Sequence, residues 1–208
     1  MARPTTFVLV RHGATSTTGQ VLPGRAPGLH LSEAGRAQAE AAAAAIARMR
    51  PRPRALYVSP LERAKETAAP IATALSLRAG VERGLNECDF GAWTGQRLTS
   101  LARRAEWRTV QHAPSSFRFP EGESFAEMQL RVWSTLERLA ARHRGQSVVC
   151  VSHADPIKAA VTFALGVPLD LFQRTVVSPA SLSVVTLSGA GPVVLCVNAG
   201  TLDRLGPS

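Results

Sequence analysis

The chain has 208 residues, of which 45% are hydrophobic, and this length and composition predict a single globular domain spanning 1–208. The formal charge is +9, but 22 scattered arginines and two lysines without interleaved aromatic rings argue against specific nucleic-acid binding. No apolar run suffices for a bilayer-spanning helix or a signal peptide, so we expect no membrane contact. Three cysteines, an odd number without a CxxC pair, favour a reduced, cytoplasmic protein.

The first predicted element is a buried strand over 7–10, where four consecutive residues are apolar. The strand ends at Arg11 and His12, and open α/β sheets bind ligands beyond the carboxyl ends of their strands. Gly13 allows the backbone to turn sharply or to approach a ligand closely. A strand followed by an ordinary polar loop explains the same residues, so the meaning of this tripeptide depends on the rest of the chain.

The next segments predict a helix, a strand and a second helix. Ser32 is a good N-cap for a helix that runs through an alanine-rich stretch to about Met49. A short strand over 55–58 follows, and Ser59 then predicts a capping box at the start of the second helix. Arg63 would lie in the first turn of that helix, where backbone N–H groups favour an anion. A solvated surface arginine is the alternative interpretation.

A loop over 85–95, punctuated by glycines, carries two acidic residues, Glu87 and Asp89, beside two aromatic residues, Phe90 and Trp93. Burial of a carboxyl group beside apolar rings raises its proton affinity. A carboxyl group that keeps its proton near neutral pH can act as a proton donor. This loop is therefore a candidate source of a general acid.

Two further helical regions are predicted in the middle of the chain. Residues 96–108 predict a helix, and 109–123 predict a loop. A second capping box, formed by Ser124 and Glu127, starts a helix that runs to about Arg144. The apolar residues of this helix recur on one stripe, which predicts that the helix packs against the core.

The apolar run over 147–152 ends at His153, as the first run ends at His12. Two such strands can lie side by side in a parallel sheet and bring both histidines to one edge. A helix over 155–165 follows, and a hairpin over 180–198 closes the chain. Strands that alternate with helices predict an α/β fold, a three-layer α/β/α sandwich with a mostly parallel central sheet and at least one antiparallel strand near the C-terminus.

Taken in order, these motifs resemble those of the histidine phosphatase superfamily, the group that includes the cofactor-dependent phosphoglycerate mutases. The matching pieces are 11–13, 59–64, 85–95 and 152–153, with lesser matches at 31–39 and 120–124. Each piece is modest by itself, and the ordered set is specific. Many members carry Trp-Asn where this chain has Thr17 and Thr18, and many have glycine where it has Ala154.

The resemblance implies roles for five residues. His12 is the nucleophile that becomes transiently phosphorylated, and Glu87 donates a proton to the leaving group. Arg11, Arg63 and His153 bind the phosphoryl oxygens, a task that suits the planar, permanently charged guanidinium group. Further candidates for substrate contact are Thr15, Thr18, Gly24, Arg25 and Ala154. Because arginines supply the positive charge and no Cys/His cluster has metal-ligand spacing, we expect neither a metal nor a cofactor.

The predicted function is hydrolysis of a small phosphorylated metabolite, a phosphomonoester, through a phosphohistidine on His12. Because the chain is too short for the insertions of the mutases, mutase-type phosphoryl transfer is the alternative. A phospho-ligand-binding module without turnover is a third hypothesis, against which the complete set of five residues argues. We also expect residues 85–124 to form a lid that sets substrate specificity, Asp155 to cap the last long helix, and exposed strand edges to permit a homodimer.

Overall fold

Six strands form one mixed sheet in the computed structural model, which describes residues 3–200. In the sheet the order is β3-β2-β4-β1-β5-β6; β1 to β4 are parallel, β5 is antiparallel to β1, and β6 is antiparallel to β5. This arrangement confirms the predicted sheet. The strands are β1 (Thr5–Arg11), β2 (Ala55–Val58), β3 (Ala79–Val81), β4 (Ser147–Ser152), β5 (Leu182–Ser188) and β6 (Gly191–Ala199). The helices are α1 (Glu33–Ala47), α2 (Glu62–Leu75), α3 (Leu98–Leu101), α4 (Ala105–His112), α5 (Phe125–Arg142) and α6 (Ala154–Ala164).

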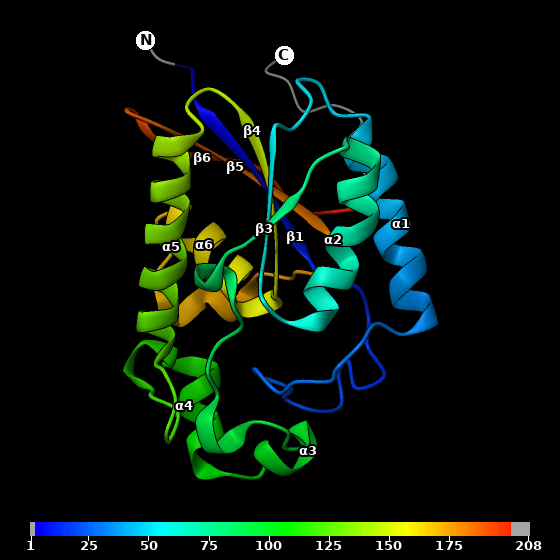
Figure 1. The fold of residues 1–208 in the computed structure, drawn as a ribbon. Coiled ribbons are helices and arrows are strands. Elements are labelled where there is room, and N and C mark those ends of the chain that lie inside the picture. Colours follow the sequence, from blue (N-terminus) through cyan, green and yellow to red (C-terminus); the bar gives the residue numbers. More distant parts are fainter. Residues whose placement is uncertain (1–2, 201–208) are drawn as a thin grey trace.

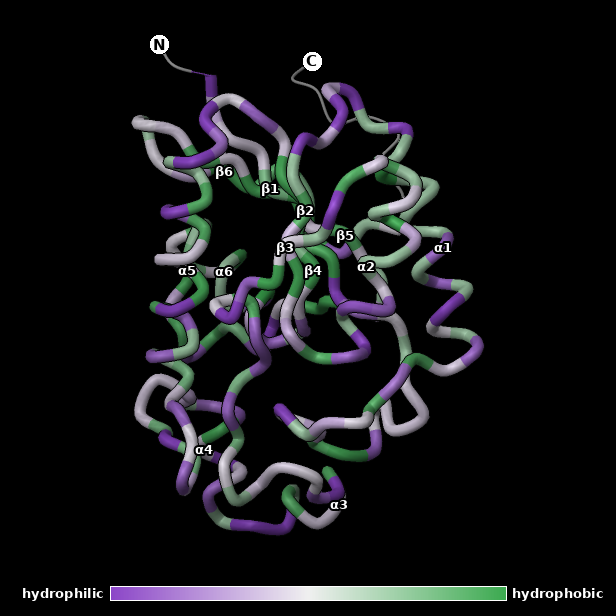
Figure 2. The backbone as a smooth tube through the Cα atoms, viewed as in Figure 1, coloured by the Kyte–Doolittle hydropathy of each residue, from purple (hydrophilic) through white to green (hydrophobic). Residues whose placement is uncertain are grey.

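Helices cover both faces of the sheet, with α1 and α2 on one face and α5 and α6 on the other (Figure 1). Alternate residues of β1 enter two core clusters: Phe7 and Leu9 face α5 and α6, whereas Val8 and Val10 face α1 and α2. Figure 2 shows hydrophobic residues concentrated along the central strands. The predicted three-layer sandwich is thus confirmed. None of the helices between residues 3 and 200 combines the length and apolar character that a bilayer crossing demands.

The pairing of β1 with β4 places two histidines next to each other. The strands are parallel, with Arg11 opposite Ser152, so His12 and His153 are the first residues beyond the two paired ends. The backbone N–H of His12 extends the ladder by donating to the carbonyl oxygen of Ser152 at 3.0 Å. The backbone alone therefore brings together the two histidines that end the two apolar runs.

Two of the three predicted helix caps are present. The hydroxyl groups of Ser32 and Ser124 accept backbone N–H groups in the first turns of α1 and α5. The third prediction, a capping box at Ser59, is wrong: α2 begins at Glu62, and its N-cap is Leu61, which makes no side-chain cap. The reason is that the hydroxyl of Ser59 turns inward, toward His153 at the end of β4 and toward Asn86.

The segment predicted as one helix over 96–108 forms two, α3 and α4, and the second extends to His112. Leu101 and Val110 are both buried, yet residues nine positions apart lie about 180° apart around a continuous helix. The break between the helices lets both residues enter the cluster that contains Trp93. These two short helices lie together at the lower end of the molecule in Figure 1, away from the body of the sheet.

The loop that follows β1 packs directly on the first turn of α1. A Cβ atom on Gly13 would lie 2.3 Å from the carbonyl oxygen of Gly35, and one on Gly35 would lie 1.9 Å from that of Ala14. No side chain fits between these two backbones. The N–H of Gly13 also donates to Oγ1 of Thr67, in α2, at 3.0 Å. Two helices therefore hold the loop that carries His12.

Gly35→Ala tests this contact. In an ordinary helix the change would stabilise the protein by up to about 1 kcal/mol, because alanine has the higher helix propensity. Here we expect the free energy of unfolding to fall by about 1–3 kcal/mol, the usual cost of overpacking. Urea denaturation measures the change, and Ala44→Gly, at an exposed position of α1, calibrates the ordinary propensity of this helix. A variant as stable as the wild type would contradict the close contact.

Candidate active site

His12 lies just beyond β1 and is almost completely buried. Its Nδ1 is 2.7 Å from the carbonyl oxygen of Gly13, which can only accept, so Nδ1 carries the proton. Nε2 keeps its lone pair and accepts a hydrogen bond from Nε of Arg63 at 3.3 Å. Burial, with the charges of Arg63 and Arg11, lowers the pKa of His12 to about 3. The ring is therefore neutral at pH 7, and neutral imidazole is the form that can act as a nucleophile.

Two arginines flank this ring, and a backbone carbonyl holds each of them. Arg63, in the first turn of α2, donates through Nη2 to the carbonyl oxygen of Gly24 at 2.7 Å. Arg11, at the end of β1, donates through Nη1 to the carbonyl oxygen of Val177 at 2.7 Å. Burial lowers the pKa of both guanidinium groups, but arginine starts from so high a pKa that both stay charged. The site thus contains two fixed positive charges.

His153 and Glu87 complete the cluster. The ring centroids of His12 and His153 are 5.1 Å apart, and Nδ1 of His153 is 4.0 Å from Oε2 of Glu87. The other carboxylate oxygen of Glu87 accepts the backbone N–H of Cys88 at 2.9 Å. Burial, and then the charge of Asp155, raises the pKa of Glu87 to about 7. Burial also holds the pKa of His153 well below its usual value, with a further contribution from His12 and the arginines.

Three atoms of this cluster are buried and lack a hydrogen-bond partner within residues 3–200: Nε of Arg11, Nη1 of Arg63 and Nδ1 of His153. A buried polar group without a partner costs about 1–3 kcal/mol, and more if it is charged. Native proteins rarely keep such groups unless a ligand or water satisfies them. Together with the lone pair of His12, these atoms define a site for an anion, and guanidinium groups match the oxygens of a phosphate ester.

The cluster opens into a cavity of about 320 Å³. Its wall includes catalytic candidates, apolar side chains of the segment 85–124 and polar side chains near α6. These are Arg11, His12, Glu87, Phe90, Leu98, Trp107, Gln111, Asp155, Lys158 and Gln173. The prediction that Asp155 caps α6 is wrong, because the N-cap is His153. Asp155 lies in the first turn of the helix and pairs with Lys158 at 3.4 Å.

The five further candidates for substrate contact are placed differently. Thr15, Thr18 and Ala154 line the cavity. The hydroxyl of Thr18 accepts the backbone N–H of Thr15 at 2.8 Å and lies 3.0 Å from its hydroxyl, so it also ties the loop together. Gly24 contributes its carbonyl oxygen, which orients a guanidinium group of the cluster. Arg25 is not among the residues that line the cavity; its side chain instead donates hydrogen bonds to Glu87, Asp89 and Glu123.

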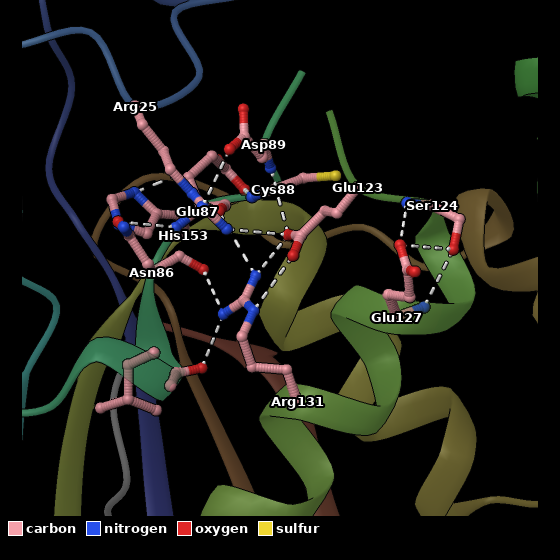
Figure 3. A network of polar contacts seen from close by, with 12 residues as sticks. Arg25, Asn86, Glu87, Cys88, Asp89, Glu123, Ser124, Glu127, Arg131 and His153 are labelled. Carbon is pink, nitrogen blue, oxygen red and sulfur yellow. Dashed lines mark hydrogen bonds and ion pairs between the residues drawn. The ribbon is translucent and has the colours of Figure 1, made fainter. Parts of the chain in front are cut away.

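Arg25 belongs to a polar network around the loop of Glu87 (Figure 3). Its Nε donates to the carbonyl oxygen of Glu87 at 2.9 Å, and its Nη2 donates to Oε1 of Glu123 at 3.1 Å. Arg131, from α5, donates to Oε2 of Glu123 at 3.2 Å. It also donates to the carbonyl oxygens of Gly84 and Asn86, at 2.8 and 3.1 Å. Two arginines that share one carboxylate therefore hold the backbone of the candidate acid.

Glu123 and Arg131 were not predicted from the sequence to be parts of the site. Arg131 lies at the edge of the buried stripe of an amphipathic helix, three residues after Met128 and four before Thr135. At such an edge the sequence pattern does not distinguish a solvated arginine from one that contacts a neighbouring loop. Glu123 lies in a segment predicted as loop. Its place in 120–124, one of the lesser family-like pieces, is the one signal that pointed to it.

The fold and the paired histidines correspond to a known family. Residues 7–200 match the histidine phosphatase superfamily, branch 1, and the chain belongs to this family. The resemblance drawn from the ordered motifs is therefore confirmed.

Three similar proteins illustrate the relationship. The chain is 37% identical over 204 residues to a protein of Mycobacterium tuberculosis named as bifunctional, and the match covers 96% of this chain but 55% of that one, so the chain spans about half the length of this relative. It is 35% identical over 197 residues to phosphoserine phosphatase 1 of Hydrogenobacter thermophilus, covering 92% and 91% of the two chains. The solved structure of a mycobacterial glucosyl-3-phosphoglycerate phosphatase superposes with a TM-score of 0.85 at 25% identity, covering 95% and 100%.

Glu87→Gln is expected to give a gain in stability that depends on pH. In the folded protein this carboxyl group keeps its proton up to about pH 7, whereas in the unfolded chain it ionises near 4.5. The raised pKa therefore contributes to the free energy of unfolding of the wild type fully below pH 4.5, and this contribution is lost as the pH rises through 7. We expect equal stability of variant and wild type at pH 4, and a variant more stable by about 3 kcal/mol at pH 8. Chemical denaturation at both pH values measures this, and a difference independent of pH would contradict the assignment.

Glu123→Gln tests the shared carboxylate. The change removes the charge that Arg25 and Arg131 share, while Arg25 keeps its ion pair with Asp89 at 3.1 Å, so we expect the free energy of unfolding to fall by about 1–3 kcal/mol. Hydrogen exchange should also accelerate at the N–H of Asp89, which donates to Glu123 at 3.1 Å. Glu121→Gln, in the same loop, is the matched control. Equal stability and exchange in the two variants would show that the network does not hold this loop.

Proposed function

We propose that the chain is a phosphomonoesterase that hydrolyses a small phosphorylated metabolite, with the phosphoryl group passing through His12. The observation that carries the proposal is the group of unpartnered buried atoms around the lone pair of His12. An anion with several oxygens satisfies these atoms together, and its phosphorus is then within reach of an unprotonated nitrogen. The relatives named as phosphatases support the same reaction class.

The first step is transfer of the phosphoryl group to Nε2 of His12. A nitrogen–phosphorus bond forms as the bond from phosphorus to the ester oxygen breaks, and the proton stays on Nδ1, which donates a hydrogen bond to the carbonyl oxygen of Gly13. Charge on the transferring group spreads over three oxygens, so catalysis depends on positioning and on fixed positive charge. Arg11 and Arg63 supply that charge from positions set by backbone carbonyl groups.

Glu87 is the proton donor to the leaving oxygen. Its raised pKa keeps the carboxyl group protonated at and below about pH 7, which general acid catalysis requires. Once it has given up the proton, the carboxylate can accept one from the water that attacks phosphohistidine. That second step breaks the nitrogen–phosphorus bond, releases inorganic phosphate and restores both residues.

The segment 85–124 is proposed as the lid that selects the alcohol part of the substrate. It contributes Phe90, Leu98 and Trp107 to the cavity wall, which also includes the polar side chains of Lys158 and Gln173. A cavity of about 320 Å³ with apolar and charged walls suits a small polar alcohol. We also propose that turnover needs no metal, since two guanidinium groups provide the positive charge. We further propose that the protein is cytoplasmic and that it forms a homodimer at a strand edge such as β6, where Val193 and Leu195 are exposed.

A panel of phosphate esters compared with His12→Ala tests the function. The panel holds phosphoserine, glucosyl-3-phosphoglycerate, 3-phosphoglycerate and p-nitrophenyl phosphate, and released phosphate is measured. We expect at least one ester to be hydrolysed, and we expect His12→Ala to lower kcat by roughly 10⁴-fold or more, as loss of a nucleophile does. Rapid quenching with labelled substrate should trap phosphohistidine in the wild type alone.

Two outcomes would overturn the proposal. Interconversion of 3- and 2-phosphoglycerate in the presence of a bisphosphorylated primer, with little free phosphate, would establish mutase-type transfer. No hydrolysis above the His12→Ala background on any ester, combined with tight binding of one of them, would establish a phospho-ligand-binding module.

A further inference from the structure

Ser59 makes contacts that its predicted role as a helix cap does not explain. It follows β2 and is fully buried, as is His153. Its Oγ lies 2.7 Å from Nε2 of His153 and 3.3 Å from Oδ1 of Asn86. The opposite nitrogen of the same ring, Nδ1, has no partner among the residues described and lies 4.0 Å from Oε2 of Glu87. Ser59 therefore touches the side of His153 that faces away from the anion site.

Two arrangements of protons are compatible with these contacts, because a serine hydroxyl has one proton and a neutral imidazole has one N–H. In the first, Ser59 donates to Asn86 and accepts from Nε2–H of His153, so Nδ1 has only a lone pair. In the second, Ser59 donates to Nε2, and the ring proton sits on Nδ1. The first arrangement would direct a lone pair at a bound anion, whereas the second offers the anion a hydrogen-bond donor.

The distances favour the second arrangement. The contact of Ser59 with Nε2 is shorter by 0.6 Å than its contact with Asn86, from 3.3 and 2.7 Å. Oδ1 of Asn86 already accepts the backbone N–H of Glu87 at 3.1 Å, so it does not need the hydroxyl proton. The backbone N–H of Leu61 approaches Oγ of Ser59 at 3.5 Å, which gives this oxygen a donor when its own proton is directed at His153.

We propose that Ser59 is a positioning residue that holds neutral His153 in the Nδ1–H tautomer, so that this ring donates a hydrogen bond to a phosphoryl oxygen. The identity of the anion rests on the proposed function, whereas the tautomer does not depend on turnover. The arrangement has a clear electrostatic advantage. Arg11 and Arg63 already place two charges in the buried site, and a neutral donor adds a hydrogen bond without a third.

Nitrogen-15 NMR of the histidine rings tests the proposal, because protonated and unprotonated ring nitrogens have well separated shifts. The samples are the wild type, Ser59→Ala and Ser152→Ala, each with and without inorganic phosphate, and His153→Asn assigns the signal. Ser152 is the matched control: it is a buried serine next to His153, and its hydroxyl donates to the carbonyl oxygen of Leu85 at 2.7 Å.

We expect Nδ1–H at His153 in the wild type and in Ser152→Ala, and loss of this preference in Ser59→Ala. Inorganic phosphate should bind about tenfold or more weakly to Ser59→Ala, as expected for a lost hydrogen bond to a charged group, and within about twofold of wild type to Ser152→Ala. His153 protonated at Nε2 alone in the phosphate-bound wild type would overturn the proposal, whether or not the variants fold. Equal phosphate affinity of the two alanine variants would overturn it too. Failure of the ester panel alone would contradict the proposed function and not the tautomer.

Discussion

The site depends on keeping two imidazoles neutral beside two buried guanidinium groups. Desolvation disfavours a charged imidazole, and the nearby arginines add repulsion. Both effects lower the pKa values of His12 and His153, so each ring is neutral and carries a single N–H at neutral pH. The arginines cannot relieve the strain by losing a proton. Although Nε2 of His12 accepts Nε of Arg63, three other nitrogen atoms of the cluster have no hydrogen-bond partner among residues 3–200, and burying them costs free energy. An anion with several oxygens removes this cost, so binding energy is concentrated where the phosphoryl group would react.

Such a cluster survives only because its surroundings are rigid. Glycine backbones in contact hold the loop after β1, and a carboxylate shared by two arginines holds the loop before α3. These supports come from segments far apart in the chain, and together they fix the positions of His12 and Glu87. Sites built in this way trade stability for a fixed geometry, which is a common feature of enzymes.

Features set by local pattern could be predicted from the sequence, and features set by tertiary contact could not. The two apolar runs that end in histidine predicted that His12 and His153 meet at one edge of the sheet. The alternation of strands and helices predicted the fold, and the order of the motifs indicated the family. Ser59 was misassigned because a serine before Pro-x-Glu satisfies the capping rule whichever way its hydroxyl turns, and only the neighbouring strand reveals the direction. Arg131 was missed because a half-buried guanidinium group that contacts a loop and a solvated one occupy the same position in a helical pattern. The roles of the cluster are still proposals.

The pairing of β1 with β4 has a consequence for how this chemistry is maintained. The 5.1 Å between the two imidazole rings is close to the about 4.8 Å that separates neighbouring strands in any sheet. The pairing of the two strands thus fixes the spacing of the two imidazole rings, whereas Arg63 and Glu87 reach the same site from the segments that connect these strands. A connecting segment can therefore change in length wherever it carries none of these side chains or their supports, and the two histidines keep their spacing.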